Sequence, residues 1–435
     1  MSTMNGKVTV MNETSYAEQM LDALQSGQVD EANKLYAWAL RKDDDETLYN
    51  LAEQLYGLGF NKKAQRIYER LLESYPDEDE LRTSLADIAI DENDLDAATA
   101  YLEAIQPTSP AYLQSLLVQA DLYQSEELFE VSEQKLLTAA KIAPDEPVVL
   151  FALGEFYFMM RAYQQAIEYY LTLIKRGIPK MEEVDLVSRI GVAYANAGKF
   201  EQAVAYLEQI HTADMTPDVR FQMGFVYTQL KDNQKAIAAF EALLEEDPSY
   251  ASVYPYLAHA LTDENRLEEA YKVAQQGLSV DEYNQDLFGQ AASLALRLND
   301  PADAEDYFKR GLALDPDNQT LMLQLSNLYV QAHKDVENVD LATQYVQNNQ
   351  VDPQVYWNLA VSYTRLEEWE LATQYYDAAQ PYFETNVDFL KPAFYFYREQ
   401  GQVETAVALL RRYLQLAPDD QEMAAALEDY EDQGY

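Results

Sequence analysis

The chain has 435 residues and no cysteine, and its 75 acidic and 31 basic residues give a formal net charge of -44. The lack of cysteine excludes disulfides, thiolate nucleophiles and cysteine-ligated zinc, and it fits a reducing compartment. The negative charge disfavours nucleic acids and anionic membrane surfaces and favours basic partners. A hydrophobic fraction of 48% indicates a folded chain rather than an acidic disordered one.

The first residues, 1–12, are predicted to form a flexible N-terminus. This stretch contains one lysine and no apolar core, so it does not resemble a secretory signal. No part of the sequence approaches the roughly 20 consecutive apolar residues that a membrane span requires. We therefore expect a cytoplasmic protein without membrane insertion.

From residue 13 onward, a pattern typical of paired helices recurs. In one well-preserved copy, the small anchor residue Ala236 is followed by Phe240, Leu243 and Pro248 at offsets of 4, 7 and 12. The anchor and the residue four positions later share one helical face, and the proline ends the helix. The predicted anchors are Ala32, Ala64, Ala97, Ser132, Ala166, Ala203, Ala236, Ala270, Ala304, Ala342, Ala372 and Ala406, in steps of 30 to 38 residues.

A second pattern precedes the anchors and predicts the first helix of each pair. A large residue, a small residue and an aromatic residue recur together, as in Leu153-Gly154-Tyr157 and Met223-Gly224-Tyr227. A small residue at a helix crossing lets the two backbones approach closely. Glycine (14) and proline (15) are scarce, and no sustained alternation of β-branched residues indicates strands.

These two patterns resemble the tetratricopeptide repeat, a helix-turn-helix unit of about 34 residues. The resemblance covers roughly residues 13–420 and is shared with the long repeat-only proteins of low-GC Gram-positive bacteria. It implies an all-α, right-handed superhelical solenoid of about twelve repeats with a C-terminal capping helix. We expect about six repeats in residues 13–216, about six in 217–418, and the capping helix with an acidic tail in 419–435.

Three places depart from the regular spacing. The segment IKRGIPKMEEVD (174–185) is predicted to lengthen a connection, and QAHKDVENVD (331–340) is predicted to contain a longer turn within a pair. The segment VQNNQVDP (346–353) is predicted to be a shortened turn.

Catalytic and metal-binding motifs are not found. The three histidines, His211, His259 and His333, lie in different repeats without a second ligand at zinc spacing. No phosphate-binding loop, dinucleotide-binding turn or nucleophile elbow occurs. We expect no catalytic residue, no metal and no cofactor, and hence no enzymatic activity.

The resemblance implies that ligands lie along the concave surface lined by the first helices. The side chains that face this surface form one stripe along each first helix, and Glu53 and Asp121 fall on it. Alternatively, about half of the stripe packs against the neighbouring repeat. The candidate ligand-binding residues are Tyr49, Asn50, Tyr56, Arg82, Phe151, Glu155, Phe158, Arg189, Asn196, Phe221, Gln222, Phe225, Tyr256, His259, Arg297, Trp357, Asn358 and Arg365.

The sequence therefore favours a non-catalytic scaffold or adaptor that binds peptide or helical segments of partner proteins, with basic or amphipathic character. An alternative is a peptide-responsive regulator of the tetratricopeptide sensor type. Such regulators usually carry an N-terminal effector module, whereas the repeats here begin by about residue 13. The partner proteins and the oligomeric state are left open.

Overall fold

The computed structural model describes residues 14–181, 183–348 and 351–435, which are helical almost throughout. The chain divides into two compact units, with the boundary between His211 and Thr212. The prediction for residues 1–12 lies outside the described residues. None of the helices in the described ranges is long and apolar enough to cross a membrane.

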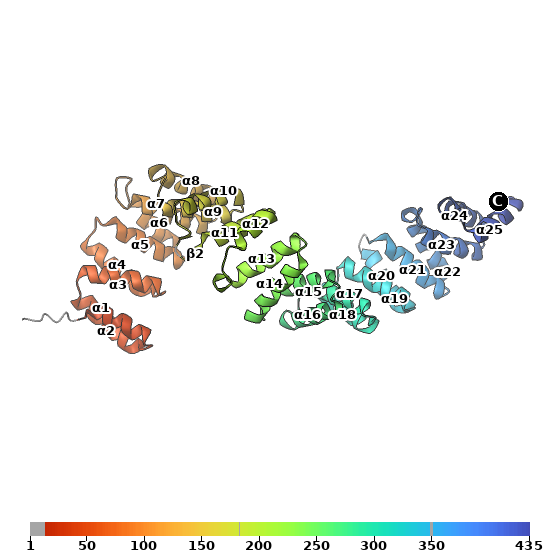
Figure 1. Ribbon diagram of the computed structural model, residues 1–435, viewed down its shortest axis with the longest axis horizontal. Helices are drawn as coiled ribbons and strands as arrows, with labels where there is room; N and C mark the ends of the chain where they lie inside the picture. The colour runs from red at the N-terminus through yellow and green to blue at the C-terminus, as the bar shows by residue number, and fades with distance from the viewer. Residues whose placement is uncertain (1–13, 182, 349–350) are drawn as a thin grey trace, which may run out of the picture. The chain divides into compact units, whose positions relative to one another are not determined.

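The first unit is a stack of six antiparallel helix pairs (Figure 1). These are α1 (Tyr16–Gln25) with α2 (Val29–Lys42), α3 (Asp45–Gly57) with α4 (Asn61–Ser74), α5 (Asp79–Asp91) with α6 (Leu95–Glu103), α7 (Tyr112–Ser125) with α8 (Phe129–Ile142), α9 (Pro147–Met159) with α10 (Tyr163–Lys175), and α11 (Leu186–Asn196) with α12 (Phe200–Leu207).

The second unit opens with the short 3-10 helix η1 (Thr212–Asp214) and contains six further pairs and a final helix (Figure 1). These are α13 (Pro217–Gln229) with α14 (Asn233–Glu246), α15 (Val253–Asp263) with α16 (Leu267–Val280), α17 (Gln285–Arg297) with α18 (Pro301–Leu314), α19 (Gln319–Gln331) with α20 (Asp335–Asn348), α21 (Pro353–Arg365) with α22 (Trp369–Ala379), η2 (Gln380–Tyr382), α23 (Val387–Glu399) with α24 (Val403–Leu416), and the capping helix α25 (Gln421–Asp432). The predicted all-α solenoid of twelve helix pairs with a C-terminal cap is confirmed.

The close helix crossing is visible at the glycines of the first helices. A β-carbon built on Gly224 would lie 2.4 Å from Cε1 of Phe240, and one on Gly154 would lie 2.5 Å from Cε1 of Tyr170. Phe240 follows its anchor Ala236 by four residues, and both are fully buried. The small residue thus makes room for the large one, as the sequence pattern predicts.

Two predicted anchors are wrong. Asp94 caps α6 by accepting a hydrogen bond from the amide of Ala97 (3.1 Å), so the buried fourth residue of that helix is Ala98 rather than Ala97. In α20 the fourth residue is Asn338, which is fully buried, while Ala342 lies one turn later. The pattern searched for a small anchor, and an asparagine in this position was therefore missed.

The corrected anchors remove two of the three predicted irregularities. The steps from Ala64 to Ala166 and from Ala236 to Ala406 are then all 34 residues. The predicted longer turn in 331–340 is wrong, because α20 begins four residues after α19 ends, as α18 does after α17. The turn in 346–353 is not shortened either: the spacing from α20 to α21 equals that from α18 to α19. Residues 349–350 of that turn lie outside the described residues.

The predicted lengthened connection between α10 and α11 is confirmed. It contains two short antiparallel strands, β1 (Lys180–Met181) and β2 (Val184–Asp185), which the sequence did not indicate. The apolar side chains Ile178, Met181 and Val184 pack against the core of the adjoining pairs. Residues 180–181 and 184–185 thus pair as a short β-ribbon, and the anchor step from Ala166 to Ala203 grows to 37 residues.

Candidate functional site

We call the surface formed by the first helices of the pairs the first-helix face, and describe it separately in each unit. In the first unit, Tyr49 packs edge-on against Tyr68, with ring centroids 5.8 Å apart. Tyr56 donates a hydrogen bond to Oδ2 of Asp91 (2.8 Å), which lies in the next repeat. Of the predicted residues in this region, Asn50 is the exposed one.

Arg82 takes part in the local structure of a repeat junction. Its guanidinium contacts Oδ1 of Asp79 at 2.6 Å and donates to the carbonyl oxygen of Pro76 at 2.5 Å. Both partners lie within six residues of Arg82, so this side chain links the start of α5 to the turn before it.

Four carboxylates lie at equivalent positions of consecutive first helices in this unit: Glu53, Asp87, Asp121 and Glu155, each 34 residues apart. We call this set the carboxylate column. Burial, together with the charges of Asp121 and Asp91, raises the pKa of Asp87 to about 7. Asp87 was missed in the sequence, although the 34-residue spacing of the carboxylates could have indicated it.

Glu155 at the end of the carboxylate column brings three predicted residues together. Its carboxylate accepts hydrogen bonds from Nε and Nη2 of Arg189 (3.0 and 2.6 Å) and from the hydroxyl of Tyr170 (2.6 Å). The Arg189 guanidinium also lies over the ring of Phe158, 4.8 Å from its centroid. Phe151, by contrast, is buried in the core, and Asn196 is exposed.

In the second unit, three predicted aromatic residues form a cluster on α13 and α15. The ring of Tyr256 meets Phe221 and Phe225 edge-on, at centroid distances of 5.4 and 5.8 Å. The ring centroid of Tyr250 lies 5.5 Å from that of Phe221. Phe221, Phe225 and Tyr256 are each partly exposed, so the cluster offers an apolar contact surface as well as packing the repeats.

Amide side chains occupy the sixth position of four first helices: Gln222 in α13, Gln290 in α17, Gln324 in α19 and Asn358 in α21. We call this set the amide column. The Oε1 atoms of its three glutamines are buried and have no hydrogen-bond partner. A buried acceptor without a donor costs about 1–3 kcal/mol, so each of these oxygens is expected to lower the stability of the fold. Gln222 and Asn358 of this column are among the candidate ligand-binding residues given above, and Gln324 was missed.

Two grooves lie along the amide column. The α15–α19 groove has a volume of about 450 Å³ and contains two predicted residues, His259 and Arg297, both exposed. The Nδ1 atom of His259 lies 3.5 Å from Oδ2 of Asp263. Gln290 and Gln324 also line this groove, together with charged groups of both signs.

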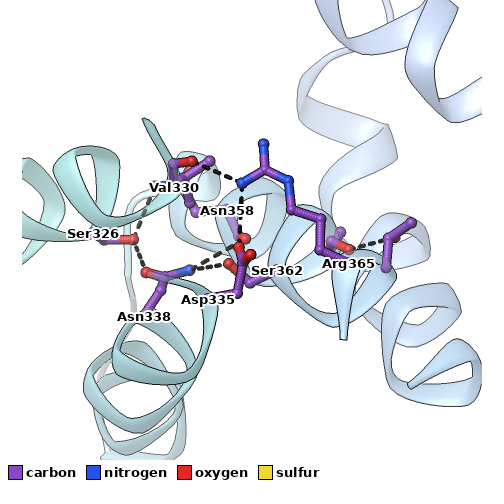
Figure 2. Close-up of polar contacts among 9 residues, drawn as sticks. Ser326, Val330, Asp335, Asn338, Asn358, Ser362 and Arg365 are labelled. Atoms are coloured by element: carbon purple, nitrogen blue, oxygen red, sulfur yellow. Dashed lines mark hydrogen bonds and ion pairs between the residues drawn. The ribbon is translucent and has the colours of Figure 1, made fainter. Parts of the chain in front are cut away.

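The α19–α23 groove has a volume of about 470 Å³ and contains Trp357, Asn358 and Arg365. The indole of Trp357 meets the rings of Phe383 and Phe389 edge-on, at 5.2 and 5.4 Å. Arg365 donates to the carbonyl oxygen of Val330 (2.7 Å) and pairs with Asp335 (3.2 Å), as Figure 2 shows.

A buried polar cluster surrounds Asn358 (Figure 2). Asn338 accepts from the hydroxyl of Ser326 (2.6 Å) and donates to that of Ser362 (2.9 Å). The amide nitrogen of Asn358 donates to Ser326 (2.9 Å) and to Oδ1 of Asn327 (2.7 Å). Asn358 is only 4% exposed, and its amide forms hydrogen bonds inside the protein. The Oε1 atoms of the three glutamines of the column, by contrast, have no hydrogen-bond partner.

Both grooves offer polar side chains and an arginine, and the α19–α23 groove also offers aromatic rings. Within the residues that the structure describes, no group of three or more histidine, aspartate or glutamate side chains could hold a metal ion. The side chains on the first-helix face offer hydrogen bonds, charge and apolar contact.

The sequence matches models of YpiA-like tetratricopeptide repeats at residues 124–178 and of YpiA-like C-terminal tetratricopeptide repeats at residues 353–420. The TPR repeat-containing protein YpiA of Bacillus subtilis (strain 168) is 33% identical over 416 residues, which cover 96% of this chain and 98% of that protein. The chain belongs to the tetratricopeptide-repeat family. Proteins of this family bind other proteins or peptides, and in this general sense the chain is a protein-interaction scaffold.

Other matches have lower sequence identity. The mouse protein O-mannosyl-transferase TMTC3 is 25% identical, over 34% of this chain and 18% of that protein. Among solved structures, the C-terminal part of a TPR repeat-containing protein from Cytophaga hutchinsonii is 15% identical, with a TM-score of 0.42, and covers 64% of this chain and 99% of that one.

Proposed function

We propose that this tetratricopeptide-repeat protein is a non-catalytic, cytoplasmic scaffold that binds segments of partner proteins in the α15–α19 groove. The volume of this groove, about 450 Å³, falls in the range of ligand sites. His259 and Arg297 are exposed in it, and neither belongs to the buried core. The groove thus presents polar side chains that are not buried by the packing of the repeats.

We also propose that the partners carry basic segments. The carboxylate column supports this, because Asp87 and Asp121 lie close enough for each to raise the energy of the other's charged form. A lysine or arginine of a partner placed between them would relieve this repulsion. The net charge of -44 would add long-range attraction, which salt weakens.

Site-specific photo-crosslinking in the native cytoplasm tests the groove. A photoreactive amino acid replaces His259, and in the control it replaces Gln276, which is exposed on the second helix α16. We expect His259 to crosslink to a small set of proteins that Gln276 does not reach, and mass spectrometry would identify them. Equal crosslinking at both positions, or none at His259, would contradict the proposal.

A further inference from the structure

A groove formed by the second helices α2 and α4 of the first unit gathers positive charge in an otherwise acidic protein. We call it the α2–α4 groove; its volume is about 450 Å³. Three arginines line it, Arg41, Arg66 and Arg70, together with two glutamates, Glu69 and Glu73. Across the whole chain, acidic residues outnumber basic ones by 75 to 31. The groove therefore reverses the sign of charge that dominates the rest of the protein.

The three arginines differ in what they contact. The Arg70 guanidinium donates to the main-chain oxygen of Leu40, which is among the last four residues of α2 and so lacks an acceptor role within that helix. Arg70 thus ties α4 to the end of α2. In the part of the chain that the structure describes, neither Arg41 nor Arg66 forms an ion pair, and both side chains are exposed. Two guanidinium groups therefore face the groove without a counter-charge.

From this we infer that the α2–α4 groove binds a phosphate monoester, with Arg41 and Arg66 donating to its oxygens. The planar guanidinium group presents paired N–H donors that match the oxygens of a phosphate. A phosphate monoester carries nearly two negative charges at neutral pH and three acceptor oxygens, so it can engage two arginines at once. The inference is independent of the proposed function, which concerns the first helices of the second unit.

The repeat fold does not require arginines at these places. Arg66 and Arg70 are the sixth and tenth residues of α4, and the same positions of α18 hold Asp306 and Arg310. There the aspartate pairs with the arginine one turn later, at 3.6 Å. In α4 an arginine replaces that aspartate, so the positive charge is not neutralised within the helix.

The charge of the rest of the protein limits the size of the ligand. Salt screens charges that lie more than about 8 Å apart at physiological ionic strength, so a compact anion in the groove responds mainly to the groove's own side chains. A nucleic acid or an anionic membrane would extend over the surrounding acidic surface and be repelled by it. A single phosphate group on a small molecule or on a partner's side chain avoids this repulsion.

Titrations of the full-length protein, followed by phosphorus NMR at constant ionic strength, test the inference. The two probes are glycerol phosphate and a neutral tripeptide with a central phosphoserine. We expect saturable binding, and Arg66→Gln and Arg41→Gln should each weaken it about five-fold. Arg310→Gln, at the position of α18 that corresponds to Arg70, is the matched control and should leave affinity unchanged.

A further variant should change affinity in the opposite direction. Glu73→Gln removes a carboxylate that lines the groove, so it should tighten binding about two-fold. A merely structural role for these exposed side chains would not produce opposite effects of the arginine and glutamate variants. Circular dichroism would confirm that each variant keeps the helical content of the wild type.

Tighter binding of the phosphoserine peptide than of glycerol phosphate would identify a phosphorylated partner protein as the ligand, and the reverse order would identify a small phosphorylated molecule. Either order supports the inference. Absence of saturable binding, unchanged affinity in both arginine variants, or weaker binding by Glu73→Gln would each overturn it.

Discussion

At the scale of single residues, the glutamines of the amide column are expected to lower the free energy of unfolding. Each buries an oxygen that has lost its hydrogen bonds to water and has gained none in the protein. Methionine has a similar length and flexibility without the acceptor, so it fills the same space at lower cost. Stability should therefore rise when methionine is introduced at these positions.

Replacing Gln324 by methionine should raise the free energy of unfolding by about 1 kcal/mol, because the unpaired acceptor is removed. Urea unfolding followed by circular dichroism would measure the change. The exposed control Gln276→Met should stay within about 0.5 kcal/mol of the wild type. Destabilisation by Gln324→Met would mean that the Oε1 atom has a partner in solution.

Asp87 should make stability depend on pH. Burial and neighbouring carboxylates raise its pKa to about 7 in the folded state, whereas it ionises near 3.9 in the unfolded chain. Between these values the folded state holds a proton that the unfolded state has lost. The stabilisation is therefore present below pH 4 and disappears as the pH rises to 7.

Asp87→Asn should be more stable than the wild type by about 1–3 kcal/mol at pH 8, with a smaller difference at pH 5. Urea unfolding at both pH values would show this, with the exposed Asp96→Asn as the control. A difference between Asp87→Asn and the wild type that does not change with pH would contradict the raised pKa.

At the scale of elements, α20 differs from the other second helices because Asn338 replaces the small anchor. Three neighbouring groups depend on this side chain: the hydroxyls of Ser326 and Ser362 and the main-chain oxygen of Asn358. The cluster joins α19, α20 and α21 by directional hydrogen bonds. Removal of one member leaves the others buried and unsatisfied.

Asn338→Ala restores the usual anchor residue, yet it should lower the free energy of unfolding by about 1–3 kcal/mol. The triple variant Asn338→Ala, Ser326→Ala, Ser362→Ala should recover most of this loss, because Asn358 keeps its bond to Asn327. Urea unfolding of both proteins would test the comparison. A triple variant less stable than the single one would show that the cluster stabilises the fold by more than satisfying the hydrogen-bonding groups of its own members.

At the scale of the whole molecule, the net charge of -44 is the dominant electrostatic property. Like charges that are held together in the folded chain repel one another more than they do in the expanded unfolded chain. Salt screens charges separated by more than about 10 Å at 0.1 M. The protein should thus be least stable at low ionic strength.

Raising sodium chloride from 20 to 500 mM should increase the free energy of unfolding by about 1–2 kcal/mol, because screening removes this repulsion. Urea midpoints at several salt concentrations would measure it, with potassium chloride as a check on ion identity. A midpoint that is flat or falls with salt would show that attractive ion pairs outweigh the net repulsion.

Much of the fold followed from local sequence, and the exceptions have clear causes. Gly154 and Gly224 indicated the close crossings because only a small residue fits beneath Tyr170 and Phe240. Asn338 was missed because it fulfils the role of an anchor by hydrogen bonding rather than by small size. The β-ribbon between α10 and α11 was missed because two-residue strands leave no period in the sequence.

By itself, the sequence determined the helix pairs, their number and the buried face of most helices, because these depend on residue size and charge at a repeat of 34 residues. Only the tertiary structure decided which members of that pattern find hydrogen-bond partners. Asn358 and Gln324 occupy equivalent positions, yet one amide is satisfied by its neighbours and the other buries an oxygen without a donor. That difference depends on side chains one repeat away, whose hydrogen bonds form only when neighbouring pairs are stacked.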